Sequence, residues 1–128
     1  MKIEHVAVAA NSEEDSDEFC IELLGLEKKR TFIVPNDLMI NFFGIDKSQK
    51  VIRYANEETD FEVFITDDNS RVKDSYTHIC LIIKHRDKFV EKAKIKNFEM
   101  AKVSREGSSN YYLFIKDKYG NLYEIKSP

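Results

Sequence analysis

The two halves of the chain repeat one order of expected elements, and this internal repeat constrains the fold most strongly. Each half is expected to run strand, helix, strand, strand, strand. In the first half these are 2–9, a helix from Ser12 to Gly25, 26–34, 50–55 and 60–66; in the second they are 76–83, 85–95, 98–103, 111–116 and 122–126. The polar segment 68–75 separates the repeats 1–67 and 76–128. We therefore predict one α+β domain of two β-α-β-β-β units.

The repeat reaches individual residues, because one His and one Glu recur at equivalent places. His5 matches His78 in the first strand of each half, and Glu62 matches Glu124 in the last. Alternation along a strand puts each Glu on the face opposite its large apolar neighbours. If the first and last strands of a unit are neighbours, each unit contributes one His and one Glu to a single surface. Two units that face each other would bring all four side chains together.

Two imidazoles and two carboxylates suit Zn²⁺, Ni²⁺, Mn²⁺, Co²⁺ or Fe²⁺ and leave coordination positions open for water or substrate. The absence of thiolates from this set argues against a closed structural zinc site. The alternative is that each His is an ordinary core or edge residue and each Glu faces water. The paired repetition favours a divalent transition-metal site over that alternative, without fixing the identity of the metal.

Composition excludes several other classes of protein. Twenty basic residues are scattered among 23 acidic ones, which leaves a net charge of −3 and argues against a nucleic-acid-binding face. No apolar run approaches the roughly 18 residues that a membrane span requires. Cys20 and Cys80 form no C-x-x-C motif, and we interpret both as reduced, buried thiols of a cytoplasmic protein.

Four further side chains are candidate substrate contacts. Arg53 lies in an expected strand and Arg105 in a loop before the last hairpin; an arginine in a cleft suits a carboxylate or phosphonate. Tyr112 and Phe114 share one face of a strand next to Glu124 and could line the pocket. The alternatives are a surface position for each arginine and core packing for each aromatic ring.

The sequence resembles the vicinal oxygen chelate superfamily, which includes glyoxalase I, methylmalonyl-CoA epimerase, extradiol dioxygenases and fosfomycin-resistance proteins. The matching stretches are 3–8, 24–27, 77–79 and 114–125. The last is close to the F-x-D-P-D-G-N-x-x-E-I ending of that family, with Lys118 where Pro is usual. The resemblance covers nearly the whole chain. It implies a glyoxalase-like fold, in which paired β-α-β-β-β units form a curled mixed sheet with a concave cleft that holds a divalent metal.

By this resemblance, His5, Glu62, His78 and Glu124 match the glyoxalase-type ligand set, and Glu62 or Glu124 doubles as the catalytic base. Extradiol dioxygenases and fosfomycin enzymes typically use two His and one Glu, so the fourth residue of ligand type favours the glyoxalase and epimerase branch. There the metal binds two substrate oxygens and stabilises an enediolate or enolate. The Arg that glutathione-dependent members carry four residues after the first His is Ala9 here, which argues against glutathione recognition.

The resulting expectation is a metal-dependent lyase or isomerase acting on a small substrate with vicinal oxygens. Two alternatives stay open. One is a non-catalytic small-molecule-binding protein, as in bleomycin resistance; the other is an extradiol dioxygenase or a fosfomycin-type transferase. The segment 35–44 is expected to be a short helix, capped by Asn36 and ended by Gly44, and it is extra to the minimal unit. It could form a wall of the cleft or a contact in a homodimer.

Overall fold

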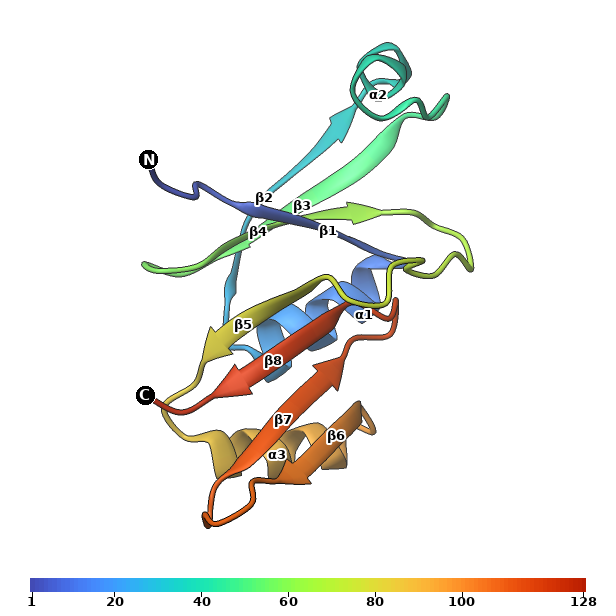
Figure 1. Ribbon diagram of the computed structural model, residues 1–128. Helices are drawn as coiled ribbons and strands as arrows, with labels where there is room; N and C mark the ends of the chain where they lie inside the picture. The colour runs from blue at the N-terminus through green and yellow to red at the C-terminus, as the bar shows by residue number, and fades with distance from the viewer. The chain divides into compact units, whose positions relative to one another are not determined.

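Each half of the chain builds a four-stranded mixed sheet, and the two sheets share one topology (Figure 1). The computed structural model describes residues 1–128 and divides into unit 1, Met1–Ser70, and unit 2, Arg71–Pro128. Unit 1 contains β1 (Val6–Ala10), α1 (Glu13–Asp17), η1 (Glu18–Leu23), β2 (Glu27–Val34), α2 (Asn36–Phe43), β3 (Gln49–Ala55) and β4 (Asp60–Ile65). Unit 2 contains β5 (His78–Ile82), α3 (Arg86–Ile95), β6 (Glu99–Ser104), β7 (Tyr111–Lys116) and β8 (Leu122–Lys126). The grouping of both repeats into one domain stays a prediction.

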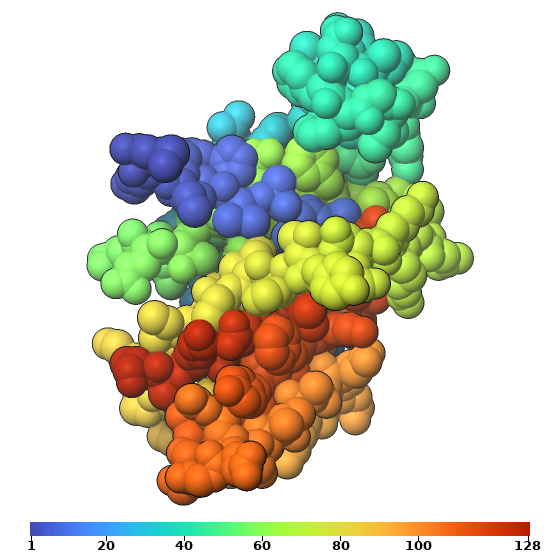
Figure 2. Space-filling view, in the orientation of Figure 1, coloured from blue at the N-terminus to red at the C-terminus, as the bar shows by residue number.

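The strand order confirms the α+β class and the expected pairing of first and last strands. The sheets run β1-β4-β3-β2 and β5-β8-β7-β6. In each, the first and last strands of the unit pair in parallel, and the other pairs are antiparallel. A parallel pair needs a crossover connection, which the intervening helix and strands of each unit provide. In the space-filling view, unit 1 is coloured from blue through green and unit 2 from yellow to red (Figure 2).

Alternation along the strands separates a buried face from a partly exposed one. On β4 the buried side chains are Phe61, Val63 and Ile65, and on β8 they are Tyr123 and Ile125. The residues between them, among them both candidate glutamates, are only half-buried. Phe19 and Leu23 in the first helix of unit 1 and Phe89 and Ala93 in α3 of unit 2 are buried as well. The expected division of β4 and β8 into two faces is therefore confirmed.

The first helix begins as expected and then widens. The Ser12 hydroxyl accepts a hydrogen bond from the Asp15 amide at 3.1 Å, which is the expected N-cap. From Glu18 the helix is a π-helix, which the spacing of apolar residues did not predict. Its end shows the wider turn, because the Leu24 amide bonds to the Phe19 carbonyl, five residues back, at 3.0 Å. Gly25 then takes a left-handed conformation, with φ of +75°.

The extra segment 35–44 is a helix, as expected, but its cap differs. Asn36 was predicted to be the N-cap; it is instead the first residue of α2, and its side chain donates to the Asp46 carboxylate at 2.9 Å. Gly44, with φ of +69°, ends the helix as expected. Met39 is fully buried and the Phe43 ring packs edge-on against Phe64 at 5.3 Å, so α2 lies against the partly exposed face of β4.

Cys20 is buried as expected, whereas Cys80 is exposed, so the prediction of two buried thiols is wrong for Cys80. Cys80 shares a face of β5 with His78, and the side chains of that face are exposed, whereas Ile79 points the other way. Both cysteines are free. None of the helices has the length and apolar character needed to cross a membrane.

A buried tyrosine joins the first helix to the sheet in unit 1 and provides a test of the fold. The Tyr54 hydroxyl donates to Asp17 Oδ1 at 2.6 Å and accepts from Ser16 Oγ at 2.9 Å. Replacing Tyr54 by Phe leaves the buried Ser16 hydroxyl without its acceptor, so we expect a loss of about 1–2 kcal/mol in the free energy of unfolding. Urea denaturation measures it. Tyr76→Phe is the matched control, since Tyr76 is 89% exposed, and an equal loss in both variants would contradict the assignment.

A second prediction concerns stability against acid. Hydrogen bonds from Lys28, at 2.7 Å, and from Lys50 lower the pKa of Glu13 from 4.5 to about 2. A carboxylate whose pKa is depressed on folding stabilises the protein above its unfolded pKa, and this contribution is lost as the pH falls from about 4.5 towards 2. We expect Glu13→Gln to reduce stability at neutral pH and the difference from wild type to vanish across that window. Solvent screening keeps the effect small. Urea denaturation at a series of pH values measures it, and a pH-independent difference would contradict it.

Candidate metal centre

In unit 1, parallel pairing places a histidine beside a glutamate. Ala7 of β1 pairs with Glu62 of β4, and His5 lies two residues before Ala7, just ahead of the strand. Residues two apart share a strand face, so the His5 ring extends towards the Glu62 side chain. His5 Nε2 lies 3.8 Å from Glu62 Oε1. Glu62 is held in a partly buried position, with its side chain 17% exposed.

Unit 2 repeats the arrangement almost atom for atom. Cys80 of β5 pairs with Glu124 of β8, and His78 lies two residues before Cys80. His78 Nε2 lies 3.7 Å from Glu124 Oε2, and the Glu124 side chain is 16% exposed. Each unit therefore presents one His–Glu pair on the partly exposed face of its sheet, as the sequence repeat predicted.

The other ring nitrogen of each histidine contacts an oxygen atom. His5 Nδ1 contacts the Glu4 carboxylate, and His78 Nδ1 lies 2.9 Å from the Tyr76 carbonyl oxygen. When Nδ1–H donates to these acceptors, the Nε2 lone pair faces the glutamate. Histidines that bind metals characteristically donate their second N–H to a carboxylate or carbonyl in this way. Sequence reasoning missed Glu4, although it directly precedes His5, and the Tyr76 carbonyl has no sequence signature.

The spacing within each pair fits a divalent ion. Two ligands about 2.1 Å from one ion are separated by about 3.0–4.2 Å, depending on the angle between them. The separations of 3.8 and 3.7 Å fall in this range. With the imidazole proton on Nδ1, Nε2 and the carboxylate are both acceptors, and a cation stabilises such an arrangement. Within either unit, no group of three or more metal-ligating side chains is gathered, so each pair supplies two donors. A single ion shared by His5, Glu62, His78 and Glu124 stays a prediction.

Arg53, a candidate substrate contact, lies directly beside the pair in unit 1. It pairs with Glu62 across β3 and β4, with Nη1 3.4 Å from Glu62 Oε2. It binds Asp60 with two hydrogen bonds of 2.8 and 2.7 Å, and Glu4 at 3.2 Å. The bond to Asp60 is the main reason that the pKa of Arg53 is raised, and Arg53 in turn lowers the pKa of Asp60. The guanidinium is thus fixed between the carboxylates of this site.

Phe114 takes the equivalent place in unit 2, because it pairs with Glu124 across β7 and β8. Its ring meets the His78 ring edge-on at 5.5 Å. The other two candidates lie further along: Tyr112 is two residues before Phe114, and the Arg105 guanidinium lies 5.1 Å from the centre of its ring. The structure therefore brings Arg53 and Phe114 to the His–Glu pairs, whereas Tyr112 and Arg105 contact each other.

The thiol of Cys80 lies opposite Glu124 in register. Desolvation and then the charge of Glu124 raise the pKa of Cys80. Ala7 occupies the same place in unit 1. The two pairs are therefore alike in their donors and different in their neighbours.

Comparisons with solved structures identify the fold. A glyoxalase family protein from Enterococcus faecalis superposes with a TM-score of 0.72 over 97% of this chain and 95% of its own, at 18% identity. The fosfomycin resistance protein FosX from Listeria monocytogenes gives 0.74 over 100% and 93%, at 14% identity. A variant of FosX, complexed with Mn(II) and 1S,2S-dihydroxypropylphosphonic acid, gives 0.71 over 98% and 88%, at 14% identity.

At sequence identities of 14–18%, the structural similarity establishes the fold alone. The chain has the glyoxalase-like α+β fold, as the sequence analysis predicted. No protein-family sequence model matches the chain, and no curated protein matches its sequence.

The charge arrangement around Arg53 predicts a measurable titration. Replacing Arg53 by Gln removes the hydrogen-bond donor that depresses the pKa of Asp60, so we expect that pKa to rise towards the ordinary value of 3.8. Carbon-13 NMR titration of the Asp60 carboxyl measures it. Arg105→Gln is the control, because Arg105 lies over Tyr112 in unit 2. An Asp60 titration that is unchanged in Arg53→Gln would contradict this account.

Proposed function

We propose that the chain is a metal-dependent enzyme of the vicinal oxygen chelate type, a lyase or isomerase that acts on a small substrate with adjacent oxygens. Its divalent transition-metal ion would be held by His5, Glu62, His78 and Glu124. The observation that supports this best is the duplicated His–Glu pair, with Nε2-to-carboxylate distances of 3.8 and 3.7 Å. The FosX neighbour complexed with Mn(II) shows that a protein of this fold can hold a divalent ion.

A bound ion would supply Lewis-acid polarisation of two substrate oxygens. The residues of the chain would do the rest. Glu62 or Glu124 would accept the proton that leaves the substrate carbon, since a carboxylate within hydrogen-bond reach is an effective general base. Each keeps a second carboxylate oxygen near a cation: Glu62 Oε2 lies 3.4 Å from Arg53, and Glu124 Oε1 lies 3.6 Å from Lys126.

The neighbours of the two pairs suggest how a substrate would be oriented. Arg53 presents a guanidinium in unit 1, which suits a carboxylate or phosphonate on the substrate. Phe114 presents an aromatic ring at the equivalent place in unit 2, which suits a carbon skeleton. Tyr112 and Arg105 would contact only a larger substrate, because Tyr112 lies further along β7 and Arg105, in the loop after β6, contacts its ring.

A second candidate is addition of water to an epoxide phosphonate of the fosfomycin type. Two observations favour it: the guanidinium beside Glu62, and FosX structures among the neighbours, one of which is complexed with a dihydroxypropylphosphonic acid. A non-catalytic small-molecule-binding protein would use the same surface without needing the metal. The four ligands of the ion would come either from one chain or from the units of two chains in a homodimer.

The metal site is tested first. We expect the purified protein, after reconstitution with Mn²⁺ or Zn²⁺, to hold about one equivalent of metal per chain. His78→Ala and Glu124→Gln should each reduce this to about a tenth or less, because second-unit donors are then lost. Elemental analysis measures the content, and light scattering of the loaded protein gives the number of chains. Glu99→Gln is the matched control, as its side chain is 76% exposed on β6. Wild-type protein that holds less than about a tenth of an equivalent would contradict the proposal.

Activity then separates the candidates. The metal-loaded protein is assayed with the hemithioacetal of methylglyoxal and, in parallel, with fosfomycin in water. Conversion of the first supports the lyase or isomerase, and ring opening of the second supports the epoxide reaction. Removal of the base should lower the rate by about 10²–10⁴-fold, so Glu62→Gln and Glu124→Gln are compared with Glu99→Gln. Binding of either compound without turnover would point to the non-catalytic alternative.

A further inference from the structure

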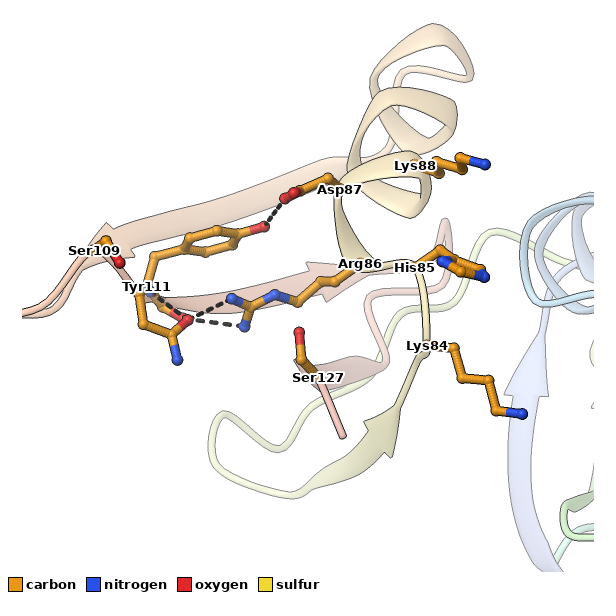
Figure 3. Close-up of a pocket in the computed structure, with 9 residues that line it drawn as sticks. Lys84, His85, Arg86, Asp87, Lys88, Ser109, Tyr111 and Ser127 are labelled. Atoms are coloured by element: carbon orange, nitrogen blue, oxygen red, sulfur yellow. Dashed lines mark hydrogen bonds between the residues drawn. The ribbon is translucent and has the colours of Figure 1, made fainter.

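Unit 2 contains a polar pocket at the end of its sheet that is remote from His78 (Figure 3). Its volume is about 630 Å³, and it lies where α3 begins, β7 begins and β8 ends. His78 is the first residue of β5, whereas Lys84 of the pocket follows its last residue, Ile82. At about 3.3 Å per residue, Lys84 lies about 20 Å along the chain from His78. The pocket is therefore separate from the His–Glu pair. Small-molecule sites typically measure about 300–1,000 Å³.

The pocket contains a buried positive charge without a negative partner. Arg86 is 9% exposed, and its guanidinium donates only to neutral oxygens: the carbonyls of Tyr111 and Ile125 at 3.2 and 3.4 Å, and Asn110 Oδ1 at 2.5 Å. The carboxylate of the pocket, on Asp87, instead accepts from the Tyr111 hydroxyl at 2.9 Å. The Tyr111 ring, 3.8 Å from the guanidinium carbon, stabilises this charge in part. A buried charge remains costly unless an opposite charge balances it, and a bound anion would do so.

The start of α3 adds further donors. His85 is the N-cap residue, and its side chain makes no capping hydrogen bond. The first backbone bond of the helix runs from the Phe89 amide to the His85 carbonyl at 3.0 Å. The amides of Arg86, Asp87 and Lys88 therefore have no partner within the helix. The exposed amides and the dipole at the start of a helix favour an anion.

The remaining lining strengthens the same preference. Lys84, which precedes α3, and Lys88, in its first turn, are exposed, and Figure 3 shows both extending on the side opposite to the Arg86 guanidinium. The hydroxyl of Ser127, by contrast, faces Arg86 in that view. The lining thus carries three cationic side chains and the single carboxylate of Asp87, and the two lysines act on a bound anion through their longer-range charge.

We propose that this pocket binds a phosphate group, either as free phosphate or as the monoester of a small molecule. The Arg86 guanidinium and the first amides of α3 contact its oxygens, and Lys84 and Lys88 raise the local positive potential. A planar guanidinium and several N–H groups match an anion with three or more oxygens better than a carboxylate with two. The site is separate from the His–Glu pairs, so it holds whether or not the proposed metal chemistry does.

The test is an NMR titration of the full chain with sodium phosphate, with sodium chloride matching the ionic strength. Saturable shifts are expected in the amides of Arg86, Asp87 and Lys88 and in the Arg86 Nε–H. Glycerol 3-phosphate, titrated in parallel, distinguishes the two sources of the group: tighter binding than phosphate indicates a monoester, and equal or weaker binding indicates the free ion. Equal shifts with chloride alone, or with acetate at the same concentration, would overturn the proposal.

Variants provide the second arm. Arg86→Gln should weaken phosphate binding by about tenfold or more, because the charged fork is lost. The exposed pair K84A/K88A should weaken it by about threefold and reduce its salt dependence, since these charges act over a longer range. The matched control, K92A/K94A at the other end of α3, should bind as wild type. If Arg86→Gln does not fold, the comparison of phosphate binding by K84A/K88A and K92A/K94A tests the proposal. Unchanged binding in K84A/K88A, or equal weakening in K92A/K94A, would contradict the site.

Discussion

The parallel pairing of the first and last strands in each unit is the constraint on which the candidate site depends. Because Ala7 pairs with Glu62 and Cys80 with Glu124, the residue two places earlier reaches the same carboxylate in both units. A slip of one residue would turn every side chain of the strand to the other face. The buried side chains on the opposite face of β4 and β8 oppose such a slip, since it would expose them. Core packing thereby fixes the position of polar side chains that are not in the core.

Duplication has preserved the donors and changed their surroundings. In unit 1, three carboxylates, on Glu4, Asp60 and Glu62, are set against the single guanidinium of Arg53, so the surface around His5 carries an excess of negative charge. An excess of that sign attracts cations. In unit 2 the place of Arg53 is taken by Phe114, which adds bulk and no charge. The surface beside His5 is therefore charged, whereas the surface beside His78 is more apolar.

Features that repeat between the two halves, or that alternate along a strand, could be predicted from the sequence. The doubled His–Glu pattern and the two faces of β4 and β8 depend only on strand periodicity, which is visible in the residues themselves. The π-helix was not visible, because Phe19, Cys20 and Leu23 form an apolar face at either helical spacing. The exposure of Cys80 depends on what covers its strand face, which periodicity does not specify. The oxygen that orients His78 belongs to the backbone, so no residue type indicates it.

The two arginines show why residue type alone does not indicate a binding site. Arg53 was a candidate because a guanidinium suits an anionic substrate, and since it contacts three carboxylates, a substrate anion would share the guanidinium with them. Arg86 had no distinguishing pattern in the sequence, because its burial depends on Asn110 and Tyr111, which approach it from β7 and the preceding loop. Its hydrogen-bond partners are all neutral, and its remaining contact is the face of the Tyr111 ring, 3.8 Å from the guanidinium carbon, so no carboxylate balances its charge. Whether a buried guanidinium binds an anion depends on how much of its charge the neighbouring groups compensate. Only the folded chain brings those neighbours together.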